Sequence, residues 1–258
     1  MKIMTFNLRA DNPLDINNRW KQREQLVYDV IHRYDCDVIG FQEVTKQMDQ
    51  GLEKEIKGYF KMGEGRTKHL FMEKNPLFIK EGWKVIQDKT FWLSKTPDKK
   101  SSTIWYSLFP RICTWVICEG QDGKRIRIYN THLDCLLPNA REYGLKVILN
   151  HIQSHQKKEA LPCILMGDFN AKPNSKLIQR FKNGQYSIKR FVAVQELEPD
   201  IYKKTTMGGF KGREEGRHID YIFVTEEFNI KNVEIVKYNK KGKYPSDHYP
   251  IVAELKIK

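Results

Sequence analysis

Two stretches of the chain repeat one pattern, in which an amphipathic helix lies between two buried strands. In the first stretch the helix is predicted at residues Trp20–Tyr34, where Val27, Val30 and Ile31 recur at helical spacing. Each stretch is therefore expected to form a β-α-β unit. The predicted elements are, in order, a strand at Ile3–Asn7, the helix at Trp20–Tyr34, a strand at Asp37–Glu43, a strand at Arg125–Thr131, a helix at Arg141–His155 and a strand at Pro162–Met166.

A polar side chain stands at or just beyond the carboxyl end of each of these four strands. Asn7 and Glu43 end the strands of the first unit, and His132 and Asp168 follow those of the second. Both pairs are separated by the same number of residues. Because the crossover between parallel strands is right-handed, each pair should lie at one edge of its sheet, where sites tend to form.

The other apolar segments are too close together for a fully parallel sheet. Further strands are predicted at Leu70–Ile79, Lys89–Leu93, Ile112–Cys118, Ile219–Val224, Val233–Tyr238 and Ile251–Ile257. Two mixed sheets packed face to face with helices outside accommodate them best, which makes the fold class α/β. A single doubly wound sheet is the alternative. No linker divides the chain, so we expect one domain over residues 1–258.

Charge and composition exclude several classes of protein. The chain has 45 Lys and Arg against 32 Asp and Glu, a net charge of +13, which favours phosphate-bearing partners. No export signal or membrane-spanning stretch is recognisable, so we expect a cytoplasmic protein without membrane insertion. The five cysteines are scattered and suggest small buried side chains rather than disulfides or a thiolate zinc site.

Carboxylates and amides dominate the candidate site residues. Asp168 and Asn170 follow a buried strand and can orient water, although an Asp/Asn turn is the alternative. Glu43, with Asn7 in the equivalent place, is costly to bury without a metal or a base. These oxygen ligands suit Mg²⁺, or Mn²⁺ as its alternative, better than zinc.

The second half of the chain adds imidazoles to this set. Asp247 and His248 precede the last strand and are either a metal or transition-state site or a loop cap. Asp220 needs a partner, which is either a catalytic imidazole or Arg217. His132 is either part of the site or a structural residue.

Taken together, the motifs resemble the endonuclease/exonuclease/phosphatase superfamily along the whole chain. The motifs that carry the resemblance are Thr5-Phe6-Asn7, Gln42-Glu43-Val44, Asn130-Thr131-His132-Leu133, Gly167-Asp168-Phe169-Asn170, Ile219-Asp220-Tyr221-Ile222 and Ser246-Asp247-His248. The resemblance implies a four-layer α/β sandwich, similar to deoxyribonuclease I, with the site at one end of its two sheets. Within the superfamily, the chain looks like a group of bacterial metal-dependent hydrolases.

The resemblance also implies a role for each of these residues. Glu43 would be the main Mg²⁺ ligand, assisted by Asn7 and Asp247. Asp168 and Asn170 would position and activate water, while His132 and His248, the latter oriented by Asp220, would stabilise charge on the phosphoryl oxygens. Arg111 is either a phosphate clamp or a surface residue. Met207–Phe210 departs from the related bacterial sequences, which have a histidine and an aromatic residue there.

Three functions follow from this interpretation. A phosphodiesterase or nuclease is favoured by the net charge and by the basic, aromatic loop at Lys237–Tyr244, which has a solvated loop as its alternative explanation. A phosphomonoesterase for a phosphorylated sugar, inositol or nucleotide is the second. A non-catalytic phosphate-binding module is the third, and the retained acidic residues argue against it. A phosphate ester, with nucleic acid as one form of it, is the expected partner, and no protein partner is implied.

Overall fold

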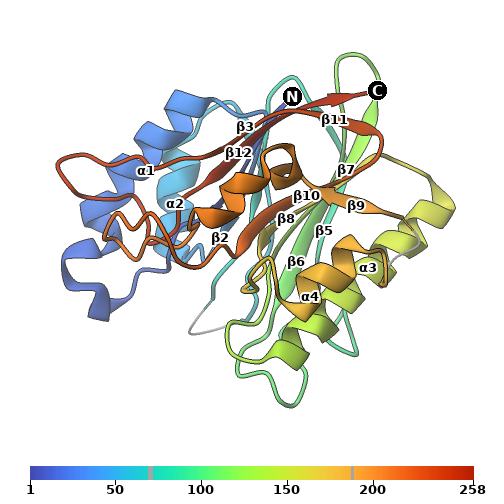
Figure 1. The fold of residues 1–258 in the computed structure, drawn as a ribbon, viewed down its shortest axis with the longest axis horizontal. Helices are drawn as coiled ribbons and strands as arrows, with labels where there is room; N and C mark the ends of the chain where they lie inside the picture. Colours follow the sequence, from blue (N-terminus) through green and yellow to red (C-terminus); the bar gives the residue numbers. More distant parts are fainter. Residues whose placement is uncertain (69–71, 187–188) are drawn as a thin grey trace.

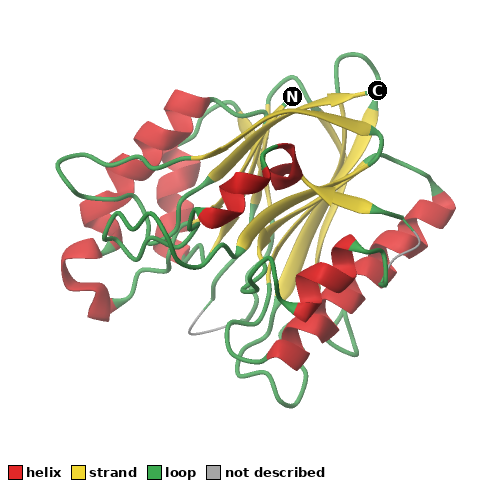
Figure 2. Cartoon of the chain, viewed as in Figure 1, coloured by secondary structure: helices red, strands yellow, loops and turns green. Residues whose placement is uncertain are grey.

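The computed structural model describes residues 1–68, 72–186 and 189–258. These residues form two six-stranded mixed sheets with helices on their outer faces (Figures 1 and 2). The two-sheet prediction is confirmed, and the single doubly wound sheet is wrong. In this part of the chain, no helix is both long and apolar enough to cross a membrane.

The first sheet contains both ends of the chain and the first β-α-β unit. Its strand order is β11-β12-β1-β2-β4-β3. The strands are β1 at Lys2–Asn7, β2 at Val38–Gln42, β3 at Tyr59–Met62, β4 at Leu77–Lys80, β11 at Phe228–Ile235 and β12 at Ile251–Ile257. The predicted parallel pairing of β1 with β2 is confirmed, and β12 runs antiparallel on the other side of β1.

The second sheet contains the second unit, with the order β5-β6-β7-β8-β10-β9. Its strands are β5 at Lys84–Trp92, β6 at Ile112–Glu119, β7 at Arg125–His132, β8 at Cys163–Asp168, β9 at Phe191–Ala193 and β10 at Asp220–Thr225. The strands β7 and β8 are parallel, as predicted, and β10 pairs antiparallel with β8.

Helices cover each sheet on one face. The first sheet carries α1 at Trp20–Tyr34 and α2 at Lys46–Glu55, and the second carries α3 at Pro138–Lys158 and α4 at Lys176–Lys182 (Figure 1). The short 3₁₀ helices are η1 at Pro13–Asn18, η2 at Val194–Leu197 and η3 at Pro199–Lys203. The helix α1 has the predicted bounds and ends at Asp35, whose left-handed φ of 44° stops it.

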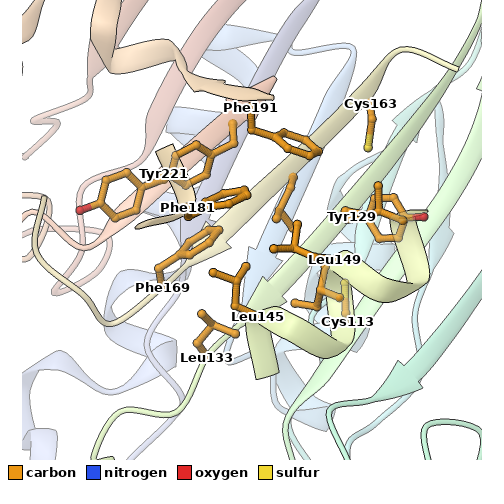
Figure 3. Packing of buried hydrophobic residues seen from close by; sticks show 14 of the residues in the cluster. Cys113, Tyr129, Leu133, Leu145, Leu149, Cys163, Phe169, Phe181, Phe191 and Tyr221 are labelled. Atoms are coloured by element: carbon orange, nitrogen blue, oxygen red, sulfur yellow. The ribbon is translucent and has the colours of Figure 1, made fainter. Parts of the chain in front are cut away.

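Three apolar clusters hold these layers together. Ile3, Val38, Ile128 and Met166 belong to the cluster between the two sheets. A second cluster joins α1 and α2 to the first sheet, and a third joins α3 and α4 to the second. Figure 3 shows part of the third cluster, where Leu145 and Leu149 of α3 pack toward the sheet. Burial of this apolar surface is the main force that stacks the four layers.

Some strand bounds differ from those predicted. In place of the strand at Leu70–Ile79, β4 begins only at Leu77, and residues 69–71 lie outside the described part. The strand predicted at Val233–Tyr238 is displaced, since β11 runs from Phe228 to Ile235 and bulges between Ile230 and Asn232. β5 extends the strand predicted at Lys89–Leu93 toward its N-terminus but stops at Trp92.

The cysteines also differ in part from the expectation. Cys36, Cys113, Cys118 and Cys163 are buried as predicted, whereas Cys135 is exposed. It lies in the loop between β7 and α3, which leaves the sheet at the end where the polar motifs gather.

Candidate active site

The sequence-predicted polar residues meet at one end of the two sheets. Asn7 and His132 are the last residues of β1 and β7, Glu43 follows β2 directly, and Asp168 is the last residue of β8. The strand register places Asp168 between His132 on one side and Asp220 on the other. The expectation that strand ends gather these side chains is therefore met by residues from both sheets.

Asn7 links the two sheets at this point. Its Nδ2 atom donates to Glu43 Oε1 and to Asp168 Oδ2, both at 3.1 Å. Its Oδ1 atom accepts from the backbone N–H of Arg9 at 2.9 Å. The amide nitrogen of Asn7, rather than its oxygen, therefore faces the two carboxylates in this arrangement.

Glu43 occupies an unusual backbone position. Its φ of 60° is left-handed, a conformation that a glutamate adopts only when its surroundings enforce it. Its Oε2 accepts from the backbone N–H of Ala10 at 2.8 Å. Burial by itself raises the pKa of this carboxyl, but the imidazoles of His132 and His248 and the donors from Ala10 and Asn7 lower the pKa to about 2. The side chain is thus held as a carboxylate.

Asp168 sits at the centre of the group and is almost fully buried. Its Oδ1 accepts from the backbone N–H of Asn170 at 2.8 Å, while its Oδ2 lies 3.6 Å from His132 Nε2 and 3.9 Å from His248 Nε2. Burial, and after it the charge of Asp220, raises the pKa of Asp168 to about 7. A carboxyl that titrates near neutrality can accept and release a proton under physiological conditions.

Gly167 allows β8 to approach β7 just before this carboxylate. Its φ is +138°, and a Cβ atom built on it would lie 1.9 Å from the carbonyl oxygen of Thr131. Only glycine fits there, so the backbone contact that sets the position of Asp168 depends on the missing side chain.

His248 is oriented by Asp220. Its Nδ1 lies 2.9 Å from Asp220 Oδ2, and both residues are buried. Burial opposes protonation of His248, but the Asp220 carboxylate outweighs it and raises the pKa of the imidazole well above its usual range. Of the two partners predicted for Asp220, the structure shows the imidazole.

His132 and Asn170 form the opposite side of the group. Asn170 Nδ2 lies 3.0 Å from His132 Nε2 and donates to the Leu133 carbonyl at 3.2 Å. Burial, followed by the charge of Arg111, lowers the pKa of His132 well below its usual range.

Asp247 joins the group through an arginine. Its Oδ2 lies 3.9 Å from Arg9 Nε, and Ser246 Oγ, which donates to the carbonyl of Asn7 at 2.7 Å, ties this segment to β1. Burial, and in addition the charge of Glu43, raises the pKa of Asp247. Arg9 was missed by sequence reasoning, because a single arginine after a strand carries no signal of its own.

Arg111 is buried, which contradicts its alternative as a surface residue. Its Nη2 donates to Cys135 Sγ at 3.3 Å. A second buried arginine, Arg66, pairs with Glu73 at 2.8 Å and has its guanidinium carbon 4.9 Å from the centre of the Phe109 ring. Sequence reasoning assigned Arg66 no role, since it follows a glycine-rich turn where arginines are usually solvated.

The donor set suits a hard divalent cation. Carboxylates and an imidazole of Asp168, Asp220 and His248 present ligand atoms within 4.8 Å of one another. Asp220 Oδ1 is buried and has no hydrogen-bond partner within the described residues. A cation bound among the carboxylates of the site, which also include Glu43 and Asp247, would offset their mutual repulsion, and oxygen ligands favour Mg²⁺ or Mn²⁺.

Comparisons with known proteins show the family and the fold. The model of the Endonuclease/Exonuclease/phosphatase family matches residues 4–248. An uncharacterized protein of Acanthamoeba polyphaga mimivirus is 25% identical, with 98% of each chain covered. Nocturnin from Rattus norvegicus is 24% identical over 92% of this chain, which spans 58% of Nocturnin. The structure of a mannosyl-6-phosphatase from Bacteroides thetaiotaomicron has a TM-score of 0.87 and 25% identity, with all of both chains covered.

Proposed function

Because the chain belongs to the endonuclease/exonuclease/phosphatase family, we propose that it is a divalent-metal-dependent hydrolase that cleaves a phosphate ester by in-line attack of water. The observation that carries the proposal is the central position of Asp168. Within one group of contacts, its carboxylate meets Asn7 of the first sheet and the two imidazoles of His132 and His248.

Glu43 and Asp247 are the residues proposed to hold the metal, with Mg²⁺ as the expected ion. Asn7, which is also expected to assist the metal, would position Glu43 through the 3.1 Å hydrogen bond from its Nδ2. When bound, the metal would polarise a phosphoryl oxygen and neutralise charge that develops there.

Asp168 and Asn170 would orient the attacking water. The Asn170 N–H fixes one oxygen of the Asp168 carboxylate, and the other oxygen accepts from Asn7 and faces the two imidazoles. A carboxylate with a pKa raised to about 7 is a suitable acceptor for the proton that the water loses.

The imidazoles would stabilise the charge of the transition state. At a pH below its raised pKa, His248 carries a proton on each ring nitrogen. Because Asp220 holds Nδ1, Nε2 would be the donor toward the substrate. His132 and Asn170 would contribute from the other side. A donor placed in this way typically contributes about 3 kcal/mol of transition-state stabilisation.

Two substrate classes remain from the sequence analysis. The diester prediction relied in part on Lys237–Tyr244, but Tyr238 OH donates to Asp29 at 3.0 Å and Tyr244 packs near Tyr249. Each of the two rings therefore has a partner within the protein, and neither contact by itself supports the diester class. The monoester class is supported by the full-length likeness to the mannosyl-6-phosphatase.

A binding module without catalysis is disfavoured by the charge of the site. Glu43, Asp168, Asp220 and Asp247 repel one another in a buried place, and burial of such a cluster costs stability. A binder of anionic phosphate would gain nothing from four carboxylates once the metal was lost.

The test is hydrolysis of a panel of phosphate monoesters and of single-stranded RNA and DNA, with Mg²⁺ and with EDTA. We expect metal-dependent hydrolysis that falls at least about 100-fold in His248→Ala. His32→Ala, which changes an exposed histidine of α1, is the matched control and should retain activity. Absence of hydrolysis throughout the panel would overturn the proposal.

A further inference from the structure

Two arginine side chains are buried together beside the candidate active site. Arg111 is 8% exposed and Arg66 is 5% exposed. Arg111 directly precedes β6, and the register that pairs Cys113 with Thr131 brings the start of β6 next to His132 at the end of β7. Arg111 therefore lies on the side of the site formed by His132 and Asn170.

Arg66 reaches the same place from the loop after β3. Its carbonyl accepts from Trp92 Nε1 at 2.8 Å, and Trp92 pairs with Ile112, the neighbour of Arg111. The ring of Phe109, two residues before Arg111, lies under the Arg66 guanidinium. The two arginines thus belong to one wall, which we call the arginine wall (Arg66 and Arg111).

The positive charges of the two arginines are not equally neutralised by neighbouring carboxylates. Arg66 forms an ion pair with Glu73, whereas Arg111 forms none with any described residue. Its Nη2 donates to Cys135 Sγ, and its Nε is buried without a hydrogen-bond partner. The guanidinium helps to lower the pKa of the Asp134 carboxyl, but that carboxylate bonds to Ser107 and to backbone N–H groups and forms no ion pair with Arg111 among the described residues. A buried guanidinium in this state is costly unless an anion binds to it, and a planar guanidinium matches two phosphate oxygens.

The charge of the anion separates the two substrate classes. A phosphate monoester carries a charge of about −1.5 to −2 near pH 7, whereas each phosphodiester linkage carries about −1. An additional cation in the site therefore stabilises a bound monoester more than a bound diester.

We propose that Arg111, supported by Arg66, binds the nonbridging oxygens of a terminal phosphate group and makes the site selective for phosphate monoesters over diesters. This inference rests on the proposed hydrolase function and names its substrate class. Arg111 contacts the phosphate, and Arg66 acts as a positioning residue through Phe109 and as a second source of positive potential.

The first experiment compares two esters with the same leaving group, p-nitrophenyl phosphate and bis(p-nitrophenyl) phosphate. We expect the wild type to prefer the monoester. Arg111→Gln should lower kcat/KM for the monoester about 10- to 100-fold and that for the diester less than about 3-fold. Arg66→Gln should change the ratio in the same direction by less.

Arg127→Gln is the matched control, because Arg127 is also buried in the second sheet but bonds to the Glu159 carbonyl near the opposite end of β7. It should leave the ratio of the two kcat/KM values unchanged. Near-ultraviolet circular dichroism and Tm establish that each variant is folded. Arg111→Lys, which retains the charge, should recover part of the lost monoester activity.

The second experiment measures orthophosphate binding by calorimetry, which requires no turnover. Arg111→Gln should weaken binding about 10- to 100-fold. If neither these two esters nor any member of the earlier panel is cleaved but orthophosphate binds and needs Arg111, the hydrolase proposal fails and the anion site stands. If esters are cleaved but Arg111→Gln affects both equally, or orthophosphate binding does not need Arg111, the monoester inference fails and the hydrolase proposal stands. Absence of both cleavage and binding overturns both.

Discussion

His248 Nδ1 and Asp220 Oδ2 lie 2.9 Å apart, and this buried contact joins the two sheets, since Asp220 begins β10 and His248 precedes β12. The imidazole is thereby fixed with its Nε2 toward Asp168. A hydrogen bond that sets the tautomer and direction of an imidazole is a recurrent requirement of acid–base sites.

Asp220→Asn should lower kcat about 100-fold or more while the fold is retained, because the amide cannot stabilise the imidazolium of His248. Steady-state kinetics with p-nitrophenyl phosphate and a thermal melt check this. Asp29→Asn, which alters a carboxylate on α1 bonded to Tyr238, is the control. A kcat within about 3-fold of the wild type would remove Asp220 from the proposed mechanism.

Removal of divalent metal should abolish hydrolysis, and addition of Mg²⁺ to the metal-free protein should raise Tm, because the ion binds the folded state and reduces repulsion among the carboxylates. At a concentration about 100 times its Kd the ion contributes about 2.7 kcal/mol. Differential scanning calorimetry with and without EDTA measures the effect. It should be lost in Glu43→Gln and kept in Glu53→Gln, an exposed change on α2; equal responses would exclude Glu43 as the ligand.

The free energy of unfolding should decrease in mild acid, partly because of His151, which lies outside the candidate site. Burial, then the charge of His155, lowers the pKa of His151 to about 3, while its ring stacks on Phe91. Below about pH 6.5, the ordinary pKa of a histidine, the unfolded chain therefore binds more protons than the folded chain. The resulting loss of stability begins there and levels off below about pH 3. Urea unfolding at pH 7 and pH 5 should show a smaller loss in His151→Gln than in the wild type.

The control for that measurement is His32→Gln, which changes an exposed histidine. It should leave the pH dependence of the unfolding free energy as it is in the wild type. A loss in His151→Gln as large as in the wild type would mean that His151 does not contribute.

Gly167→Ala should destabilise the protein by more than about 3 kcal/mol, because the new Cβ would overlap the Thr131 carbonyl and the backbone conformation is also strained. Gly242→Ala separates these two causes, since φ at Gly242 is +75° but no described atom beyond its chain neighbours lies within 4 Å of its Cβ position. We expect a cost of about 1 kcal/mol there. Equal unfolding free energies for the two variants would contradict the role given to the close backbone contact.

The sequence predicted both β-α-β units because long, strongly periodic segments carry their own signal. It missed α2 at Lys46–Glu55, in which only Met48 and Leu52 are buried apolar residues, and β9, which has three residues. The start of β11 was missed for a different reason. Its sequence alternates poorly around the bulge, and pairing with β12 defines its extent.

The site residues were predicted where a strand end marks the position, as at Asn7 and Asp168. Arg9 and Arg66 were missed because each is a single charged residue in a loop, and such residues are usually solvated. Only the three-dimensional arrangement places Arg66 over Phe109 and thereby beside Arg111. The exposure of Cys135 could not be predicted from the sequence either, because it depends on the path of the loop before α3.

The position of β12 between β11 and β1 sets when the candidate site can form during synthesis of the chain. Asn7 receives the hydrogen bond of Ser246 across 239 residues of chain. At a synthesis rate of about 5 to 20 residues per second, roughly 10 to 50 seconds pass between the synthesis of β1 and that of β12, its neighbour in the sheet. A nascent chain therefore carries an open strand edge, and the group of site residues can be complete only after translation has passed β12.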